Sequence, residues 1–97
     1  VVMRSRLIIN CDNKRIQEHM AIVGTAIAKL NAMDFTVDRV EIDGYQRPSI
    51  RVNYDNRCRQ EQEHGKAVRY GSGNDDKGNY EWWQIQVNNC RVTWEAR

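Results

Sequence analysis

Long apolar runs are missing from this chain, and with them the stretch of about 20 apolar residues that a transmembrane helix needs. The same lack excludes the apolar core of a signal peptide. The sequence therefore predicts a protein that does not insert into a membrane, and we expect it in the cytoplasm.

Cysteine is scarce as well, and Cys11, Cys58 and Cys90 lie far apart along the chain. A small secreted protein held by disulfides would carry an even and denser set. No C-x-x-C pair occurs, and His64 is the nearest histidine to Cys58, too distant for the short ligand spacing of a zinc knuckle. We therefore expect reduced thiols, no metal site and no cofactor.

Neither sign of charge dominates, since 15 basic residues face 13 acidic residues in a chain of 97. The formal charge of +2 allows an anionic partner but lacks the sharp basic excess of a typical duplex-binding domain. Apolar residues make up 40% and charged residues 29%, a globular composition. The length suits one domain over residues 1–97, and Met3, after two valines, is a candidate for the true first residue.

One segment, residues 12–33, has the periodicity of an α-helix. Its apolar residues recur at steps of three and four, which places them on one stripe: Ile16, Met20, Val23, Ile27 and Leu30. Asp12 or Asn13 suits the N-cap of this helix. Gly24 costs a helix about 1 kcal/mol relative to alanine, and we expect it to let a neighbouring backbone approach closely.

Six segments are predicted as strands, at residues 3–10, 36–43, 49–54, 66–70, 79–87 and 91–95. Most of them alternate apolar and polar residues, the pattern of a sheet with one buried face. Phe35 and Val37 have the opposite parity to Val40 and Ile42, which indicates a bulge or a late start in the second strand. The order is β-α-β-β-β-β-β, an α+β fold with one helix packed on one face of a mostly antiparallel sheet. We expect a right-handed first crossover and an antiparallel meander of the later strands.

The connections are predicted from their turn residues. Residues 55–65 are polar and charged, which indicates a loop, and residues 71–78 are glycine-rich, which indicates a flexible hairpin connection. Asn88 and Asn89 suit a two-residue type I′ turn, because asparagine tolerates positive φ. In a meander, Cys58 and Cys90 fall at the same end of the sheet, so the pair is a candidate disulfide.

A single helix leaves one sheet face uncovered, and that face is the first candidate for function. It combines arginine with an exposed tryptophan, side chains that provide large contact areas and directional hydrogen bonds in binding surfaces. The predicted binding residues are Arg39, Arg51, Asn53, Trp82, Gln84 and Arg91. We expect Arg51, Trp82 and Arg91 to act as anchors, and an ordinary solvated face is the alternative interpretation.

The predicted function is a non-catalytic binding or inhibitor protein whose partner is another protein. The alternative is a nucleic-acid-binding domain that adds four basic residues to the same face: Arg57, Arg59, Lys66 and Arg69. An enzyme is not expected, because neither His19 nor His64 has a nucleophile at a recognisable spacing. A homodimer, formed through an exposed edge strand at residues 66–70, is left open.

Three stretches resemble those of small orphan accessory proteins encoded by phages and prophages. They are residues 40–44, Arg47-Pro48 with residues 50–52, and residues 90–95, which cover roughly half of the chain together with their surroundings. The resemblance extends to no defined family and carries no catalytic residue. It implies an accessory role in which the protein binds and occludes a host factor or a defence complex, as anti-CRISPR and anti-restriction proteins do.

Overall fold

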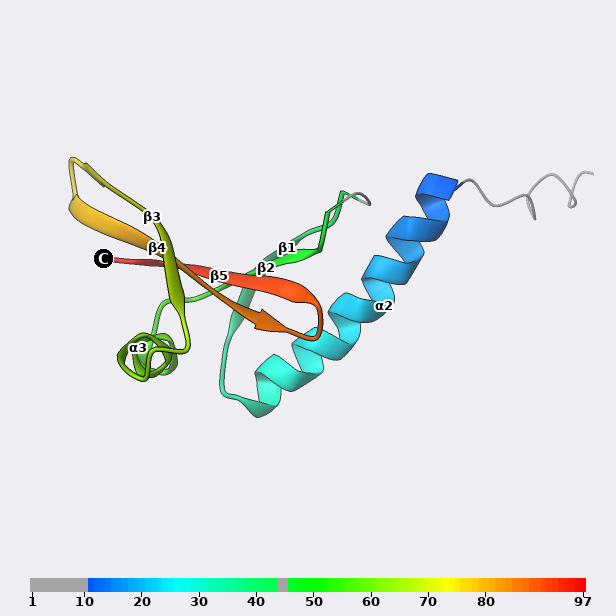
Figure 1. Ribbon diagram of the computed structural model, residues 1–97, viewed down its shortest axis with the longest axis horizontal. Coiled ribbons are helices and arrows are strands. Elements are labelled where there is room, and N and C mark those ends of the chain that lie inside the picture. Colours follow the sequence, from blue (N-terminus) through cyan, green and yellow to red (C-terminus); the bar gives the residue numbers. More distant parts are fainter. Residues whose placement is uncertain (1–10, 44–45) are drawn as a thin grey trace, which may run out of the picture.

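The computed structural model describes residues 11–43 and 46–97; the predicted strand at residues 3–10, and the handedness of the crossover that follows it, lie outside this part. The described elements are α2 (Cys11–Ala32), β1 (Val37–Glu41), β2 (Ser49–Val52), α3 (Asn56–Glu63), β3 (Val68–Asp75), β4 (Gly78–Val87) and β5 (Cys90–Ala96). They form a mixed α+β structure around a five-stranded, mostly antiparallel sheet (Figure 1), which confirms the predicted fold class. Neither described helix is long and apolar enough to span a membrane.

The sheet order is β1-β2-β5-β4-β3, and this order corrects the predicted meander. β3, β4 and β5 do form a meander and β1 pairs antiparallel with β2, but β2 pairs with β5 in parallel. Ser49 lies opposite Arg91, and Arg51 lies opposite Thr93. The connection from β2 to β3 therefore crosses the sheet instead of turning back beside β2.

The parallel pairing also overturns the proposed disulfide. Cys90 opens β5 next to the start of β2, whereas Cys58 follows the end of β2, where its thiol donates to the carbonyl oxygen of Asn53 at 3.3 Å. The two cysteines thus lie toward opposite ends of the sheet. Both are buried free thiols.

α2 confirms the helix predicted from the periodicity, with two differences. It begins at Cys11, so Asp12 and Asn13 lie inside the helix and neither is its N-cap. Gly24 is exposed, and a Cβ atom added to it would meet no atom within 4 Å. No neighbouring backbone approaches this glycine closely, contrary to expectation.

The C-terminal end of α2 is closed by a left-handed residue. Asp34 adopts a φ of 67°, and the amide of Phe35 donates to the carbonyl oxygen of Leu30 at 2.9 Å. This hydrogen bond satisfies a helix-end carbonyl in the manner of a Schellman motif. The turn directs the chain from α2 into β1.

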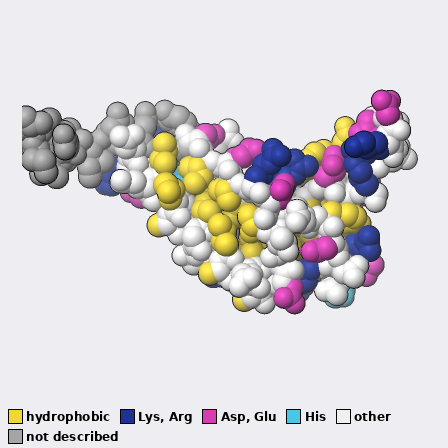
Figure 2. All heavy atoms as spheres, turned by 180° about the vertical axis from the view of Figure 1, so that it is seen from behind, with side chains coloured by type: hydrophobic (Ala, Val, Ile, Leu, Met, Phe, Trp, Pro, Cys, Tyr) yellow, Lys and Arg dark blue, Asp and Glu magenta, His cyan; other side chains and the backbone are white. Residues whose placement is uncertain are grey.

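Only the C-terminal half of the predicted α2 stripe is buried. Val23 and Leu30 belong to the core and Ile27 is partly buried against it, but Ile16 and Met20 are 36% and 59% exposed. In Figure 2, apolar side chains form a band that starts near the N-terminal end of the described chain and runs toward the middle of this face. The apolar stripe thus continues beyond the part of the sheet that covers it.

The predicted loop at residues 55–65 is wrong, because residues within it form α3. The carboxylate of Asp55 accepts hydrogen bonds from the amides of Arg57 and Cys58 and so caps the helix. No proline or glycine interrupts the eight residues that follow. A polar sequence without an apolar stripe can still form a short helix when its first turn is capped.

α3 packs on the same side of the sheet as the core residues of β5. The indole nitrogen of Trp94 donates to the side-chain oxygen of Gln62 at 2.8 Å, and Trp94 itself is fully buried. Glu61 is 3% exposed although it is charged. Among the described residues, two helices rather than one therefore cover the core face, and neither of them covers the opposite face.

Strand parity is confirmed in β1, β2, β4 and β5, but not in β3, where a bulge between Arg69 and Gly71 shifts the phase. The predicted bulge lies between Val37 and Arg39, and past it Val40 pairs with Ile50 on the core face. The Asn88-Asn89 turn has the expected positive φ values of 48° and 63°. The glycine-rich residues 71–78 differ from expectation, since most of them extend β3, and the turn is confined to its last residues.

Candidate functional site

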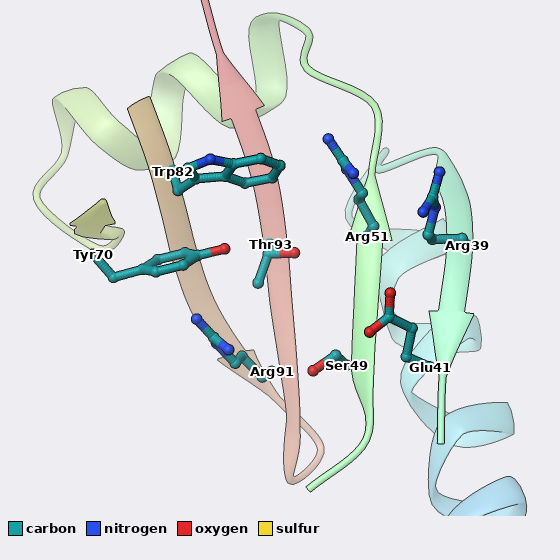
Figure 3. A pocket seen from close by; sticks show the side chains of 8 residues that line it. All are labelled: Arg39, Glu41, Ser49, Arg51, Tyr70, Trp82, Arg91 and Thr93. Atoms are coloured by element: carbon teal, nitrogen blue, oxygen red, sulfur yellow. The ribbon is translucent and has the colours of Figure 1, made fainter. Parts of the chain in front are cut away.

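The open face of the sheet carries a shallow pocket of about 200 Å³ (Figure 3). It lies on the side opposite to both helices and draws side chains from all five strands of the described sheet. Its lining consists of Arg39, Glu41, Ser49, Arg51, Tyr70, Trp82, Arg91 and Thr93. We call these eight residues the face pocket.

Strand pairing places these side chains together because residues opposite each other point to the same face. Arg39 lies opposite Arg51 across β1 and β2, and Arg51 lies opposite Thr93 across β2 and β5. At the β3 edge of the sheet, β3 has a bulge between Arg69 and Gly71. Tyr70 lies in this bulge, and its ring centroid is 6.4 Å from that of Trp82. The pocket is thus bounded by arginines from the first strands and aromatic rings from the last.

Two arginines of the face pocket are each held against an aromatic ring. The guanidinium carbon of Arg51 lies 4.5 Å from the ring centroid of Trp82, and that of Arg91 lies 4.3 Å from the ring centroid of Tyr70. The Arg91 Nε also donates to the side-chain oxygen of Gln84 at 2.6 Å. Stacking on an aromatic face fixes the plane of a guanidinium and leaves its edges free for directional hydrogen bonds.

The charge of the face pocket is positive, since three arginines face one glutamate among its lining residues. Glu95 adds a second carboxylate nearby, 4.0 Å from Arg51, but at that distance it leaves the guanidinium largely available. The hydroxyls of Ser49 and Thr93 add hydrogen-bonding groups. This combination suits carboxylate or phosphate oxygens better than a cation.

No catalytic or metal arrangement is visible in the face pocket. Its lining contains neither histidine nor cysteine, so its two hydroxyls have no adjacent imidazole or thiolate. Across residues 11–43 and 46–97, no group of three or more His, Cys, Asp or Glu side chains is placed to hold a metal ion. What the site offers is recognition by charge, hydrogen bonds and aromatic area.

Most of the predicted binding residues meet at this pocket. Arg39, Arg51, Trp82 and Arg91 line it, and Gln84 holds Arg91 in place. Asn53 does not take part: it follows β2, and its amide donates to the carbonyl oxygen of Thr36 at 2.9 Å.

The predicted set did not include Glu41, Ser49, Tyr70 and Thr93, and among these Tyr70 contributes the largest side chain to the pocket. Alternation along β3 does not predict Tyr70 on the open face, where the structure places its ring beside Trp82. The bulge next to Tyr70 alters the strand's phase, and the flanking Gly71 is the signal in the sequence that could have indicated it.

The four basic residues of the nucleic-acid alternative lie outside the face pocket. Arg57 and Arg59 belong to α3, on the covered side of the sheet, and Lys66 lies in the connection to β3. Arg57 pairs with Glu61 at 2.6 Å, and Arg69 pairs with Glu81 at 2.8 Å. The hydrogen bond from Arg69 lowers the pKa of the Glu81 carboxyl, as expected for a paired carboxylate.

Both described thiols are chemically protected. Burial raises the pKa of Cys58 to about 11 and also raises the pKa of Cys90. Because the thiolate is the reactive form, these cysteines have little nucleophilic character near neutral pH. They serve as small apolar core residues rather than as part of a site.

We expect Cys58 and Cys90 to resist Ellman's reagent at pH 8 in the folded protein and to react when urea unfolds it. The raised pKa favours the neutral thiols in the fold, so their contribution to stability is complete below the unfolded value near 9. It is lost as the pH rises above about 9, and the part that Cys58 contributes is lost as the pH approaches its folded pKa of about 11. Urea titrations at pH 8 and pH 10 measure this loss, and Cys58→Ala is expected to reduce it. Rapid modification of both thiols in the folded state at pH 8 would contradict the prediction.

A family model described as "Uncharacterised protein" matches residues 4–97, nearly the whole chain. No curated protein and no solved structure matches the chain.

Proposed function

The chain belongs to the family described as "Uncharacterised protein", and we propose its function from the geometry of the face pocket. The protein is a non-catalytic binding module that holds an acidic segment of a partner protein against the open sheet face. The observation that carries this proposal is the pair of arginine–aromatic stacks, Arg51 on Trp82 and Arg91 on Tyr70, around one pocket that both helices leave uncovered.

The stacks support binding because they lower the entropy lost when a ligand is bound. An arginine already fixed on a ring loses less rotamer freedom on contact with a carboxylate than a free one does. Arginine, tyrosine and tryptophan are also the residue types that dominate the binding energy of protein interfaces. The positive pocket supplies the electrostatic complementarity that favours an acidic partner.

The resemblance to phage accessory proteins supports a biological setting for this activity. A module of this size that occupies a surface can inhibit a host factor or a defence complex without any chemistry of its own. The protected thiols of Cys58 and Cys90 are compatible with the reducing cytoplasm, where such partners act.

Nucleic acid is less well supported as the partner. Arg57 and Arg69 are committed to Glu61 and Glu81, and Arg59 donates hydrogen bonds to the side-chain oxygens of Asn56 and Tyr54 at 3.0 Å and 3.3 Å. Of the four basic residues in this alternative, only Lys66 is then left to join the face pocket in binding phosphates. A duplex-binding surface would be expected to align more free cations along one face.

Selection from a random peptide display library tests the proposal. The wild type is expected to enrich Asp- and Glu-rich sequences, and Trp82→Ala and Arg91→Ala are each expected to weaken binding of a selected peptide at least tenfold. Lys77→Ala removes one positive charge at the exposed β3–β4 turn and serves as the control, with affinity within twofold of wild type. Isothermal titration calorimetry measures the affinities.

Two outcomes would contradict the proposal. One is enrichment of sequences without acidic residues, or equal losses in the pocket variants and in Lys77→Ala. The other is tighter binding to a single-stranded oligonucleotide than to any selected peptide, with affinity that falls steeply between 50 and 300 mM salt, as phosphate neutralisation requires.

A further inference from the structure

Within residues 11–43 and 46–97, two features on the covered side of the protein leave apolar side chains exposed. The first is the N-terminal half of the α2 stripe, where Ile16 and Met20 are 36% and 59% exposed. The second is β1, an edge strand whose core-face residue Val40 is 36% exposed. An apolar groove of about 470 Å³ lies between the C-terminal half of α2 and the start of β1.

β1 also carries two charged residues, Arg39 and Glu41, that make few ion pairs within the described part of the chain. Arg39 contacts the carboxylate of its neighbour Asp38 at 3.8 Å, and both side chains are about half exposed. Within the described part of the chain, Glu41 has no ion-pair partner. Both residues point to the open face of the sheet (Figure 3).

We propose that a second copy of this chain pairs with the free edge of β1, antiparallel and about a two-fold axis. Edge strands present unpaired backbone groups that favour such pairing, and a two-fold contact uses the same patch on both copies. The charges of β1 favour a second copy as the partner. In one register, the positive charge of each strand lies opposite the negative charge of the other.

The register follows from the faces of the sheet. Opposite residues in an antiparallel pair must point to the same face, so a slip by one residue would set core-face side chains against the open face. Three registers keep the faces aligned near the centre of β1. One sets Arg39 opposite its own copy, and one sets Glu41 opposite its own copy, so both place like charges together.

The remaining register places Val40 on the two-fold axis. Arg39 of each copy then lies opposite Glu41 of the other, which gives two cross-strand pairs of opposite charge on the open face. On the core face, Val40 meets its copy on the side where α2 carries Ile16 and Met20. One two-fold axis would thus pair the β1 edges of the two copies and bring their exposed α2 stripes to the same side of the dimer interface.

This dimer goes beyond the proposed function and leaves its anchors available. Arg51, Trp82 and Arg91 lie on inner strands, away from the β1 edge. Pairing of Arg39 with Glu41 would neutralise the outer rim of each pocket and align the two open faces in one continuous sheet.

Charge reversal tests the register directly. The wild type is expected to sediment as a dimer in analytical ultracentrifugation. Arg39→Glu and Glu41→Arg are each expected to raise the dissociation constant at least tenfold, since each sets two like-charged pairs across the axis. The variant with both substitutions restores opposite charges and is expected to return to within threefold of wild type. Lys77→Glu, a reversal remote from β1, is the control.

A second variant reports on the helices. Met20→Glu is expected to weaken the dimer at least tenfold, whereas Met20→Leu keeps an apolar side chain and is expected to have no effect. Circular dichroism shows that each variant remains folded. A wild type that stays monomeric at millimolar concentration would overturn the proposal. So would a dimer that is indifferent to the single reversals, or one that the double reversal fails to restore.

Discussion

Truncation of Trp94 to alanine is expected to lower the free energy of unfolding by about 3–5 kcal/mol. Trp94 is the largest fully buried side chain, its ring stacks on Phe35 with centroids 6.2 Å apart, and its indole nitrogen donates to Gln62. The substitution would leave a cavity between the sheet and α3 and an unpaired amide oxygen. Because domains of this size are stable by only about 5–15 kcal/mol, urea denaturation followed by circular dichroism should show a large shift of the midpoint.

The control for this prediction lies on the same sheet. Trp82→Ala removes an equally large side chain, but from the open face, where the ring is only partly buried. We expect a loss of about 1 kcal/mol, from the stack with Arg51 and the contact with Tyr70. Similar losses in the two variants would show that the open face is packed like a core, which would contradict the two-sided character of the sheet.

The second large effect is expected at Arg57. This side chain ties three parts of the molecule together: it donates to the carbonyl oxygen of Met33 at 2.8 Å, pairs with Glu61 at 2.6 Å and lies over the ring of Phe35. Arg57→Ala would leave the buried carboxylate of Glu61 without its partner. We expect a loss of about 2–3 kcal/mol in the free energy of unfolding, measured by urea denaturation at pH 7.

A double variant separates the unpaired charge from the lost packing. Arg57→Met with Glu61→Leu removes both charges and keeps similar volumes, and well-packed replacements of buried ion pairs are often neutral. We therefore expect this variant to be more stable than Arg57→Ala by at least about 1 kcal/mol. If the two variants were equally destabilised, the loss would come from the hydrogen bond and packing of Arg57 rather than from the unpaired charge of Glu61.

Strand parity was the most reliable guide from the sequence to the site. Alternation alone placed Arg51 and Trp82 on one face and Val92 and Trp94 on the other, as the structure has them. The change of phase at Val37 also indicated either a bulge or a late start of β1, and the structure has the bulge. Parity succeeds because side chains must alternate in a pleated strand whatever its neighbours are.

Pairing partners, by contrast, depend on contacts that the sequence pattern does not contain. The meander was assumed because sequential strands are often neighbours, but α3 carries the chain across the sheet and lets β5 enter beside β2. α3 was missed for a related reason: its polar residues show no apolar stripe, and the capping potential of Asp55 was not weighed. The disulfide hypothesis failed with the meander that it assumed.

The role of Arg57 illustrates the limit for individual side chains. In the sequence it is one basic residue among several, and it was grouped with Arg59, Lys66 and Arg69 as a phosphate contact. The structure places it between the end of α2 and α3, where it holds Met33 and Glu61. Only the tertiary arrangement separates an arginine that stabilises the fold from one that faces a ligand.

The parallel junction between β2 and β5 has a consequence for the order of folding. The β1–β2 hairpin and the β3–β4–β5 meander can each form from local contacts, but Ser49 and Arg91 are separated by about forty residues of chain. Closing that long loop is slow relative to hairpin formation, and contacts of high sequence separation slow the folding of small domains. The two halves of the sheet should therefore be structured early, and their joining at β2 and β5 should limit the rate at which the open face is assembled.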